Sequence, residues 1–221
     1  MSHGKQFTLY TNKKGPNGWK VAIVLEELGL AYEPVYLDFG KGEQKAPAHT
    51  KHNPNGRIPT LIDHANGDYT LWESDAILYY LVEKYDPEHK VSVADAGERF
   101  QVLQWLFFQA SGQGPYFGQA LWFKFYHSET LPSAQERYQK ETKRVLGVLE
   151  GVLAKQDTLV GGKITIADLS FIPWNDMAIN SILDIDVAAE YPVVTAWHKK
   201  LVERPAAKKV LEVRAAMNAP A

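Results

Sequence analysis

The chain contains no cysteine, and this absence restricts its chemistry more than any other feature of its composition. It excludes disulfide crosslinks, zinc sites built on thiolates, and any mechanism in which a thiol of the protein acts as the nucleophile. If the protein takes part in thiol chemistry, the sulfur must therefore come from a molecule that it binds.

The 221 residues also lack a charge excess and a long apolar run. Lys and Arg number 24 and Asp and Glu number 26, a formal net charge of -2, so nothing favours binding to nucleic acid or to an anionic membrane. No apolar run approaches the roughly 20 residues of a membrane span, and residues 1–7 are too polar for a signal peptide. We expect a cytoplasmic protein whose partners are small molecules or proteins.

The first part of the chain alternates strand patterns with helical ones. Residues 7–10 form a strand pattern, residues 19–28 have apolar residues at helical spacing, and residues 32–39 form a second strand pattern. A strand, a helix and a strand joined by short turns predict a right-handed βαβ unit with parallel strands. Residues 40–55 are polar and irregular, with room for about one short helix.

Two more strands and a helix follow. The strands are expected at residues 60–63 and 69–72, and the Asn66-Gly67 dipeptide between them is favoured in tight hairpins because both residues tolerate positive φ. A helix is expected over residues 73–85. The polar stretch 87–96 then makes a domain boundary.

Everything after this boundary has helical spacing. A Gly- and Pro-containing break at 112–115 bends or interrupts the first of the helices, which are expected at residues 100–109, 133–155, 166–182, 192–203 and 206–217. We therefore expect a mixed α/β domain over residues 1–87 and an all-helical domain over residues 97–221. Thr165 and Asp168 form a capping box at the start of one helix, and its loss is expected to cost about 1 kcal/mol, or more if the helix is buried.

The most informative residues are Arg57-Ile58-Pro59 and Glu73-Ser74. The proline resembles the cis-proline of the thioredoxin-like fold. If the Ile58-Pro59 peptide is cis, the backbone of Ile58 faces outward, where an extended peptide can pair with it like an added strand. Glu73 can then bind an ammonium group, and Ser74 with the helix N-terminus can bind a carboxylate, which suits a γ-glutamyl group. The alternative is that Pro59 only starts a strand and Ser74 only caps a helix.

Asn17 lies beside the start of the first helix. A side-chain amide can donate to a thiolate but cannot remove a proton at neutral pH, so its role would be stabilisation and not base catalysis. Lowering a thiol pKa by one unit from about 8.5 makes it about tenfold more ionised near neutrality, for about 1.4 kcal/mol. The alternative is that Asn17 only caps the helix, although one residue can do both.

The remaining candidate groups have simpler explanations. Phe108, Tyr116 and Trp122 are candidates for an apolar second-substrate pocket, but core packing or a dimer contact explains them equally well. Tyr10 is explained by strand packing and need not be a catalytic phenol. No metal site is expected, because metal-ligand spacing is missing among the histidines His49, His52, His64, His127 and His198.

Taken together, several segments resemble the glutathione transferase superfamily over essentially the whole chain. The resemblance includes the fungal group related to the yeast nitrogen-catabolite regulator and the bacterial nu-class enzymes. It implies an α/β thioredoxin-like N-terminal domain plus an all-α C-terminal helical bundle, and a homodimer with glutathione sites near its interface. The segments are GPNGWKVAIVLEELGL, LDFGKGEQKAP, NPNGRIPTLID, LWESDAILYYL, QWLFFQASGQGPYFGQA, ERY and ITIADLSFIPW.

The resemblance also implies a role for each candidate residue. Asn17 would face the glutathione sulfur, Ile58 would pair with the peptide backbone, and Glu73 with Ser74 would hold the γ-glutamyl end. Gln44 and Arg57 align with contacts to the glycine end. Arg137 resembles an arginine that reaches the site of the neighbouring subunit.

The sequence departs from its relatives at two positions that matter for activity. It lacks the Tyr, Ser or Cys of the better-known transferase classes, so aryl-halide conjugation should be weak. Gly15 stands where nu-class enzymes have a threonine, so a second donor to the thiol is missing. The Asn- and Gln-rich segment of the yeast regulator is also absent, and prion behaviour is not expected.

Two functions fit these features. The first is an enzyme that uses the glutathione thiol to reduce disulfides, to remove glutathione from adducts or to reduce peroxides. The second is a binding or regulatory protein of the same fold that retains glutathione or an apolar ligand with little turnover. The fold alone does not decide between them.

Overall fold

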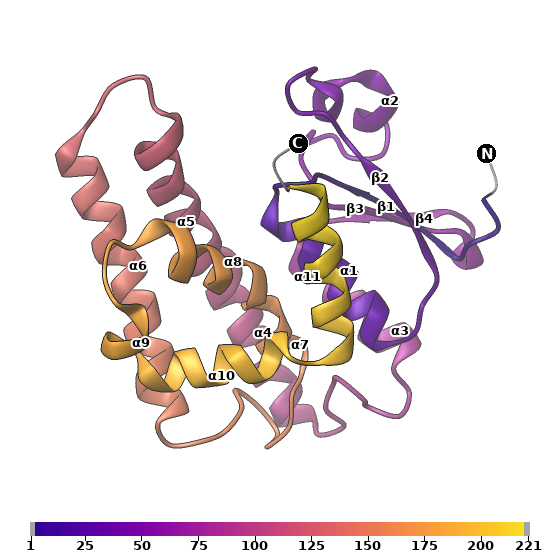
Figure 1. Ribbon diagram of the computed structural model, residues 1–221. Coiled ribbons are helices and arrows are strands. Elements are labelled where there is room, and N and C mark those ends of the chain that lie inside the picture. The colour runs from indigo at the N-terminus through magenta and orange to yellow at the C-terminus, as the bar shows by residue number, and fades with distance from the viewer. Residues whose placement is uncertain (1–2, 219–221) are drawn as a thin grey trace. The chain divides into compact units, whose positions relative to one another are not determined.

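The computed structural model describes residues 3–218, and its chain divides into two compact units (Figure 1). The mixed unit comprises the residues up to Val91 and those from Glu203 onward. The helical unit comprises Ser92–Val202. The sequence predicted these two classes of domain, and the unit boundaries differ from the prediction mainly at the C-terminal end.

A four-stranded sheet forms the centre of the mixed unit. Its strands are β1 (Phe7–Thr11), β2 (Tyr32–Tyr36), β3 (Thr60–Asp63) and β4 (Tyr69–Trp72), in the spatial order β2-β1-β3-β4. β1 and β2 are parallel, whereas β3 runs antiparallel to both β1 and β4. The predicted βαβ unit and the predicted antiparallel pair are therefore confirmed, although β2 ends three residues earlier than expected.

The turn between β3 and β4 differs from the predicted tight hairpin. Residues His64–Asn66 form a 3-10 turn, and the positive φ angles are those of Gly67 (66°) and Asp68 (57°). The cause is the carboxylate of Asp63, which accepts a hydrogen bond from the Ala65 backbone N–H at 3.1 Å and starts the turn early. The residues with positive φ are therefore displaced by one position along the chain.

Helix α1 (Pro16–Glu27) connects β1 to β2 and begins three residues before the expected range of 19–28. Gly29 has a φ of 67°, its N–H donates to Glu26 and the N–H of Leu30 donates to Leu25. These two bonds form a Schellman motif, which pairs backbone carbonyls at the helix end. The chain is thereby turned directly into β2.

Gly18 allows the first turn of α1 to lie directly against the end of β1. A Cβ atom at Gly18 would be 1.9 Å from Oγ1 and 2.8 Å from Cβ of Thr11, which is itself buried. We expect Gly18→Ala to lower the free energy of unfolding by about 3 kcal/mol, because the packed core cannot absorb the added atom. Chemical denaturation measures this change.

Two variants serve as controls for this prediction. Thr11→Gly in combination with Gly18→Ala leaves only the Thr11 Cα, at 3.5 Å, and should recover all but about 1 kcal/mol. Gly147→Ala adds a methyl group to an exposed helical position with nothing within 4 Å, and should stabilise by up to about 1 kcal/mol. A Gly18→Ala protein as stable as the wild type would contradict the close contact.

The last helix belongs to the mixed unit, which corrects the predicted helical domain of residues 97–221. Helix α11 (Pro205–Met217) lies alongside α1 (Figure 1). Just before it, the Arg204 guanidinium donates two hydrogen bonds, of 2.6 and 2.8 Å, to the buried carboxylate of Glu27. Lys209 pairs with Glu26 at 2.7 Å. These ion pairs to α1 attach the C-terminal helix to the first unit.

The helical unit contains the predicted bundle with more interruptions than expected. Its α-helices are α4 (Ala96–Phe108), α5 (Gly114–Leu121), α6 (Pro132–Leu153), α7 (Ile166–Ser170), α8 (Ile172–Met177), α9 (Val187–Glu190) and α10 (Pro192–Val202). The predicted break at 112–115 is a π-helical turn, Gln109–Gln113, after which Pro115 lies in the first turn of α5, where its missing N–H costs little. Within residues 3–218, no helix has both the length and the apolarity needed to cross a membrane.

The capping box predicted at residues 165–168 is present and is completely buried. The Asp168 carboxylate accepts hydrogen bonds from the N–H and the hydroxyl of Thr165, from the N–H of Leu159 and from the indole of Trp197. Burial raises the pKa of Asp168, and these donors oppose the rise. Asp168 therefore joins three segments of the helical unit as well as capping α7.

Candidate functional site

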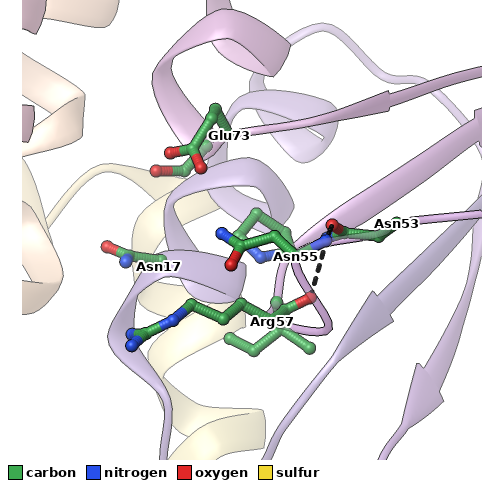
Figure 2. A pocket seen from close by; sticks show the side chains of 8 residues that line it. Asn17, Asn53, Asn55, Arg57 and Glu73 are labelled. Carbon is green, nitrogen blue, oxygen red and sulfur yellow. Dashed lines mark hydrogen bonds between the residues drawn. The ribbon is translucent and has the colours of Figure 1, made fainter. Parts of the chain in front are cut away.

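A polar pocket opens in the mixed unit, beside the first turns of α1 and of helix α3 (Ser74–Tyr85) (Figure 2). It brings together the residues that the sequence singled out at positions 17, 57–58 and 73–74. Its lining consists of Asn17, Asn53, Asn55, Arg57, Ile58, Pro59, Glu73 and Ser74.

The loop before β3 supplies one wall of the pocket. The Ile58-Pro59 peptide is cis, as the thioredoxin-like interpretation required. The Arg57 carbonyl and the Thr60 hydroxyl each accept a hydrogen bond from the side-chain amide of Asn53, at 2.9 and 3.0 Å. Asn53 is buried, and its oxygen accepts from the backbone N–H of Asn55. Asn53 therefore holds the loop that presents Ile58.

Sequence reasoning missed Asn53 and Asn55. Figure 2 shows the Asn55 side chain in the middle of the pocket, between Asn17 and Asn53. The signal available in the sequence was the run Asn53-Pro54-Asn55-Gly56, because asparagine before proline and glycine is typical of turns closed by the asparagine side chain. This run therefore indicates a turn closed by asparagine side chains, and not an irregular loop, which makes both residues predictable from the sequence.

Gln44 lies beside Gly56 of this loop and does not line the pocket. Gly56 has a φ of 58°, and a Cβ on it would be 2.9 Å from the Gln44 carbonyl oxygen. The same carbonyl lies 2.9 Å from the ring Nδ1 of the buried His49. The side-chain Oε1 of Gln44 is buried and has no hydrogen-bond partner among the described residues. Its predicted contact with the glycine end of a ligand stays a prediction.

Glu73 has an unusual backbone conformation at the entrance to α3. Its φ is 69° and its ψ 113°, a region that costs a residue with a side chain about 1 to 3 kcal/mol and that is found most often at functional sites. Glu73 occupies the N-cap position and its side chain makes no capping bond, so its carboxylate remains at the pocket. The alternative that Ser74 only caps the helix is wrong, because Ser74 is the first residue inside it.

Asn17 lies in the first turn of α1 and lines the pocket. The N-cap position is occupied by Gly15, and no side chain caps this helix. The alternative that Asn17 only caps the helix is therefore wrong. Figure 2 shows Asn17 and Glu73 around the same open space, with the Arg57 side chain along its edge.

The pocket suits a zwitterionic peptide. It combines one carboxylate, one guanidinium and several amides with the positive N-terminal ends of α1 and α3. No histidine, tyrosine or cysteine is among its lining residues. It can therefore bind and orient an extended ligand and stabilise a negative charge, but it offers no strong base of its own.

The predicted second-substrate residues lie in the helical unit and have separate neighbours there. Phe108 contacts the rings of Trp105 and Phe171, with centroid distances of 5.6 and 6.4 Å. Tyr116 is 6.5 Å from Tyr138, and Trp122, which is 50% exposed, stacks on Tyr126. None of the three lines the described pocket. Their role in a second-substrate site stays a prediction.

Two other residues have simple surroundings. Arg137 is exposed on α6, and its predicted reach to a neighbouring subunit stays a prediction. Tyr10 stacks on the ring of His52 at 5.8 Å and is not a lining residue of the pocket, which agrees with a packing role.

Comparison with protein families identifies both parts of the chain. Residues 5–83 match the family model "Glutathione S-transferase, N-terminal domain", and residues 113–205 match "Glutathione S-transferase, C-terminal domain". The chain belongs to the glutathione S-transferase family. The thioredoxin-like and all-helical organisation predicted for this transferase is confirmed.

Individual relatives identify the group within the family. Glutathione S-transferase 1 of Schizosaccharomyces pombe is 52% identical, over 95% of this chain and 96% of its own length. The transcriptional regulator URE2 of Saccharomyces cerevisiae is 41% identical, over 93% of this chain and 67% of its own length. The crystal structure of glutathione transferase URE2P6 from Phanerochaete chrysosporium in complex with oxidized glutathione is 64% identical and superposes with a TM-score of 0.97, over 99% and 100% of the chains. The predicted resemblance to the fungal group is confirmed.

Proposed function

We propose that this transferase binds glutathione in the polar pocket and uses the glutathione sulfur to reduce disulfides, to remove glutathione from adducts or to reduce peroxides. The observation that carries the proposal is Asn17, an amide donor at a helix N-terminus in a pocket built for a zwitterionic peptide. The absence of cysteine supports a borrowed sulfur. The related URE2P6 was crystallised with oxidized glutathione.

In the proposed pose, glutathione lies extended along the loop before β3. The backbone of Ile58 pairs with the cysteinyl residue, as an added strand would. Glu73 binds the γ-glutamyl ammonium, while Ser74 and the N-terminus of α3 bind the adjacent carboxylate. Arg57, which lines the pocket, is assigned to the glycine carboxylate, and Gln44 is placed at the same end by the family resemblance alone. This orientation directs the sulfur towards Asn17.

The chemistry requires two molecules of glutathione for each disulfide. The glutathione thiolate attacks one sulfur of the substrate, the S–S bond breaks, and the other sulfur leaves as a thiolate that takes up the proton glutathione released. A second glutathione thiolate then attacks the mixed disulfide, which yields oxidised glutathione and the second substrate thiol. Asn17 stabilises the attacking thiolate, and the low reorganisation of a fixed donor makes this stabilisation effective.

Conjugation of aryl halides is expected to be slow. The position that carries Tyr, Ser or Cys in better-known transferases carries no such group here, and Gly15 offers no hydroxyl to the thiol. In the structure, the space beside Gly15 is already occupied, because a Cβ there would be 3.0 Å from the Ile58 Cδ1. A turnover panel with disulfides, hydroperoxides, acyl-methyl glutathione adducts and an aryl halide tests the proposed preference.

A regulatory function is the second candidate, and the 41% identity to the regulator URE2 favours it. In that case the protein would bind glutathione or an apolar ligand with little turnover. A glutathione titration beside the turnover panel separates the two functions. Binding with turnover supports the enzyme, binding without turnover supports the regulator, and the absence of both contradicts each of them.

Glu73→Gln is expected to weaken glutathione binding about tenfold to a hundredfold. The carboxylate would lose a charge-assisted bond to the ligand ammonium, which is worth about 1.5 to 3 kcal/mol. Isothermal titration measures the change in Kd. Glu83→Gln on the exposed face of the same helix is the matched control and should bind like the wild type. Equal affinities for all three proteins would contradict the assignment of the γ-glutamyl end to Glu73.

We further propose that the transferase is a cytoplasmic homodimer in which Arg137 reaches the partner's glutathione site. The cytosolic glutathione pool is a reducing one, as thiol chemistry with reduced glutathione requires.

Phe100 and Phe107, which are 72% and 70% exposed, are spaced to lie on one face of α4. Two exposed phenylalanines on one helix face favour burial of that face against a second copy of the chain. Light scattering tests the dimer, and Arg137→Ala tests the contact through the Kd for glutathione.

A further inference from the structure

A buried ion pair joins the two helices whose first turns line the pocket. The Nζ of Lys20 on α1 lies 2.9 Å from the Oδ1 of Asp75 on α3, and the two side chains are only 1% and 10% exposed. Lys20 follows Asn17 by about one helical turn, and Asp75 directly follows Ser74. The pair therefore connects the sulfur end of the proposed site to its amino-acid end.

Glu73 is the second carboxylate near the Lys20 ammonium. Burial lowers the pKa of Lys20, and the negative charges of Asp75 and then of Glu73 oppose this lowering. The other oxygen of Asp75, Oδ2, is buried and has no hydrogen-bond partner among the described residues. The contact with Lys20 is therefore the main polar function of Asp75. A buried ion pair contributes little net stability, because desolvation offsets most of the attraction.

We propose that Asp75 is a positioning residue that gives the pocket its specificity for a ligand with an ammonium group. By pairing with Lys20, Asp75 cancels the buried positive charge and leaves the Glu73 carboxylate to the ligand. Without Asp75, Glu73 is the other carboxylate near Lys20, and because a buried ammonium keeps its charge only beside an opposite one, Lys20 competes with the ligand ammonium for Glu73. The inference rests on the proposed function, because the ammonium is the one of the γ-glutamyl end.

The test compares glutathione with glutaryl-cysteinylglycine, which lacks only the α-amino group. Isothermal titration is done with the wild type, with Asp75→Asn and with the double variant Lys20→Met/Asp75→Asn. The wild type should prefer glutathione. Asp75→Asn should bind glutathione about tenfold to a hundredfold more weakly, because Lys20 then competes with the ligand for Glu73, and it should bind the analogue with unchanged affinity. The double variant has no uncancelled charge and should regain the preference for glutathione.

Two further measurements separate positioning from a merely structural role. In disulfide exchange, Asp75→Asn should raise the KM for glutathione by the same factor as the Kd and leave kcat nearly unchanged. Lys20→Met alone keeps both carboxylates and should prefer glutathione at least as strongly as the wild type. If Asp75→Asn does not fold, the preference of Lys20→Met for glutathione over the analogue remains a test of the inference. Asp68→Asn, an exposed acid in the same unit, is the matched control.

The possible results are distinct. Equal weakening of both ligands by Asp75→Asn, a double variant no better than Asp75→Asn, or a Lys20→Met protein without the preference would each overturn the inference. A wild type that does not bind glutathione would overturn the proposed function itself. If the wild type and Asp75→Asn both prefer glutathione to the same extent, the proposed function stands and only the role of Asp75 is overturned.

Discussion

Replacing Asn17 with alanine should leave the fold intact and lower kcat for disulfide exchange about tenfold, because the amide accounts for about one unit of the thiol pKa, or about 1.4 kcal/mol of thiolate stabilisation. Asn17 does not cap α1, so its removal leaves the helix N-terminus as it is. The amide lines the pocket where the proposed pose directs the sulfur. Steady-state kinetics with a disulfide substrate and thermal melting measure the two effects.

The controls for Asn17→Ala concern the amide and the charge. Asn66→Ala removes an exposed amide that is bonded only to the Tyr80 hydroxyl in the described structure, and its turnover should equal that of the wild type. Asn17→Asp keeps the size of the side chain but brings a negative charge next to the thiolate, and its turnover should be lower still. Unchanged kinetics in Asn17→Ala would remove Asn17 from the mechanism.

Asp168→Ala should lower the free energy of unfolding by about 4 kcal/mol or more. The sequence alone predicted about 1 kcal/mol, the usual value of a helix cap, or more for a buried helix. The structure raises the expected loss because the buried carboxylate also accepts hydrogen bonds from Leu159 and Trp197. Each buried donor left without a partner costs about 1 to 3 kcal/mol. Denaturant unfolding followed by tryptophan fluorescence measures the change.

The matched control for Asp168 is another aspartate at a helix start. Asp186 caps the short helix α9 through a 3.1 Å bond to the Ala189 N–H and is exposed. Asp186→Ala should cost about 1 kcal/mol or less. If Asp168→Ala and Asp186→Ala are equally destabilising, Asp168 is only a cap and does not join the three segments of the helical unit.

The elements with clear periodicity could be predicted from the sequence, and those set by distant contacts could not. The βαβ unit, the antiparallel pair β3-β4 and the capping box depend on residues close to each other in the chain. The attachment of α11 depends on Arg204 and Glu27, which lie far apart in the sequence. An amphipathic helix does not reveal which unit covers its apolar face, so the predicted boundary was wrong at that end.

The same distinction holds for the pocket. Asn17, Glu73 and Ser74 could be predicted because each has a local signal beside the start of a helix. The run Asn53-Pro54-Asn55-Gly56 indicates a turn, but the bonds of Asn53 to Arg57 and Thr60 also depend on where β3 begins in the folded chain. The positive φ of Glu73 could not be predicted, because a glutamate rarely adopts this region of the backbone.

The pKa of bound glutathione shows whether the site ionises a borrowed thiol. Because the chain has no cysteine, the ultraviolet absorbance of a thiolate in the complex arises from the ligand alone. A pH titration of the wild-type complex should give a thiol pKa at least about one unit below the usual value near 8.5, and Asn17→Ala should return it towards that value. A bound thiol that ionises at the same pH as free glutathione in both proteins would show that neither Asn17 nor the helix N-terminus stabilises the thiolate.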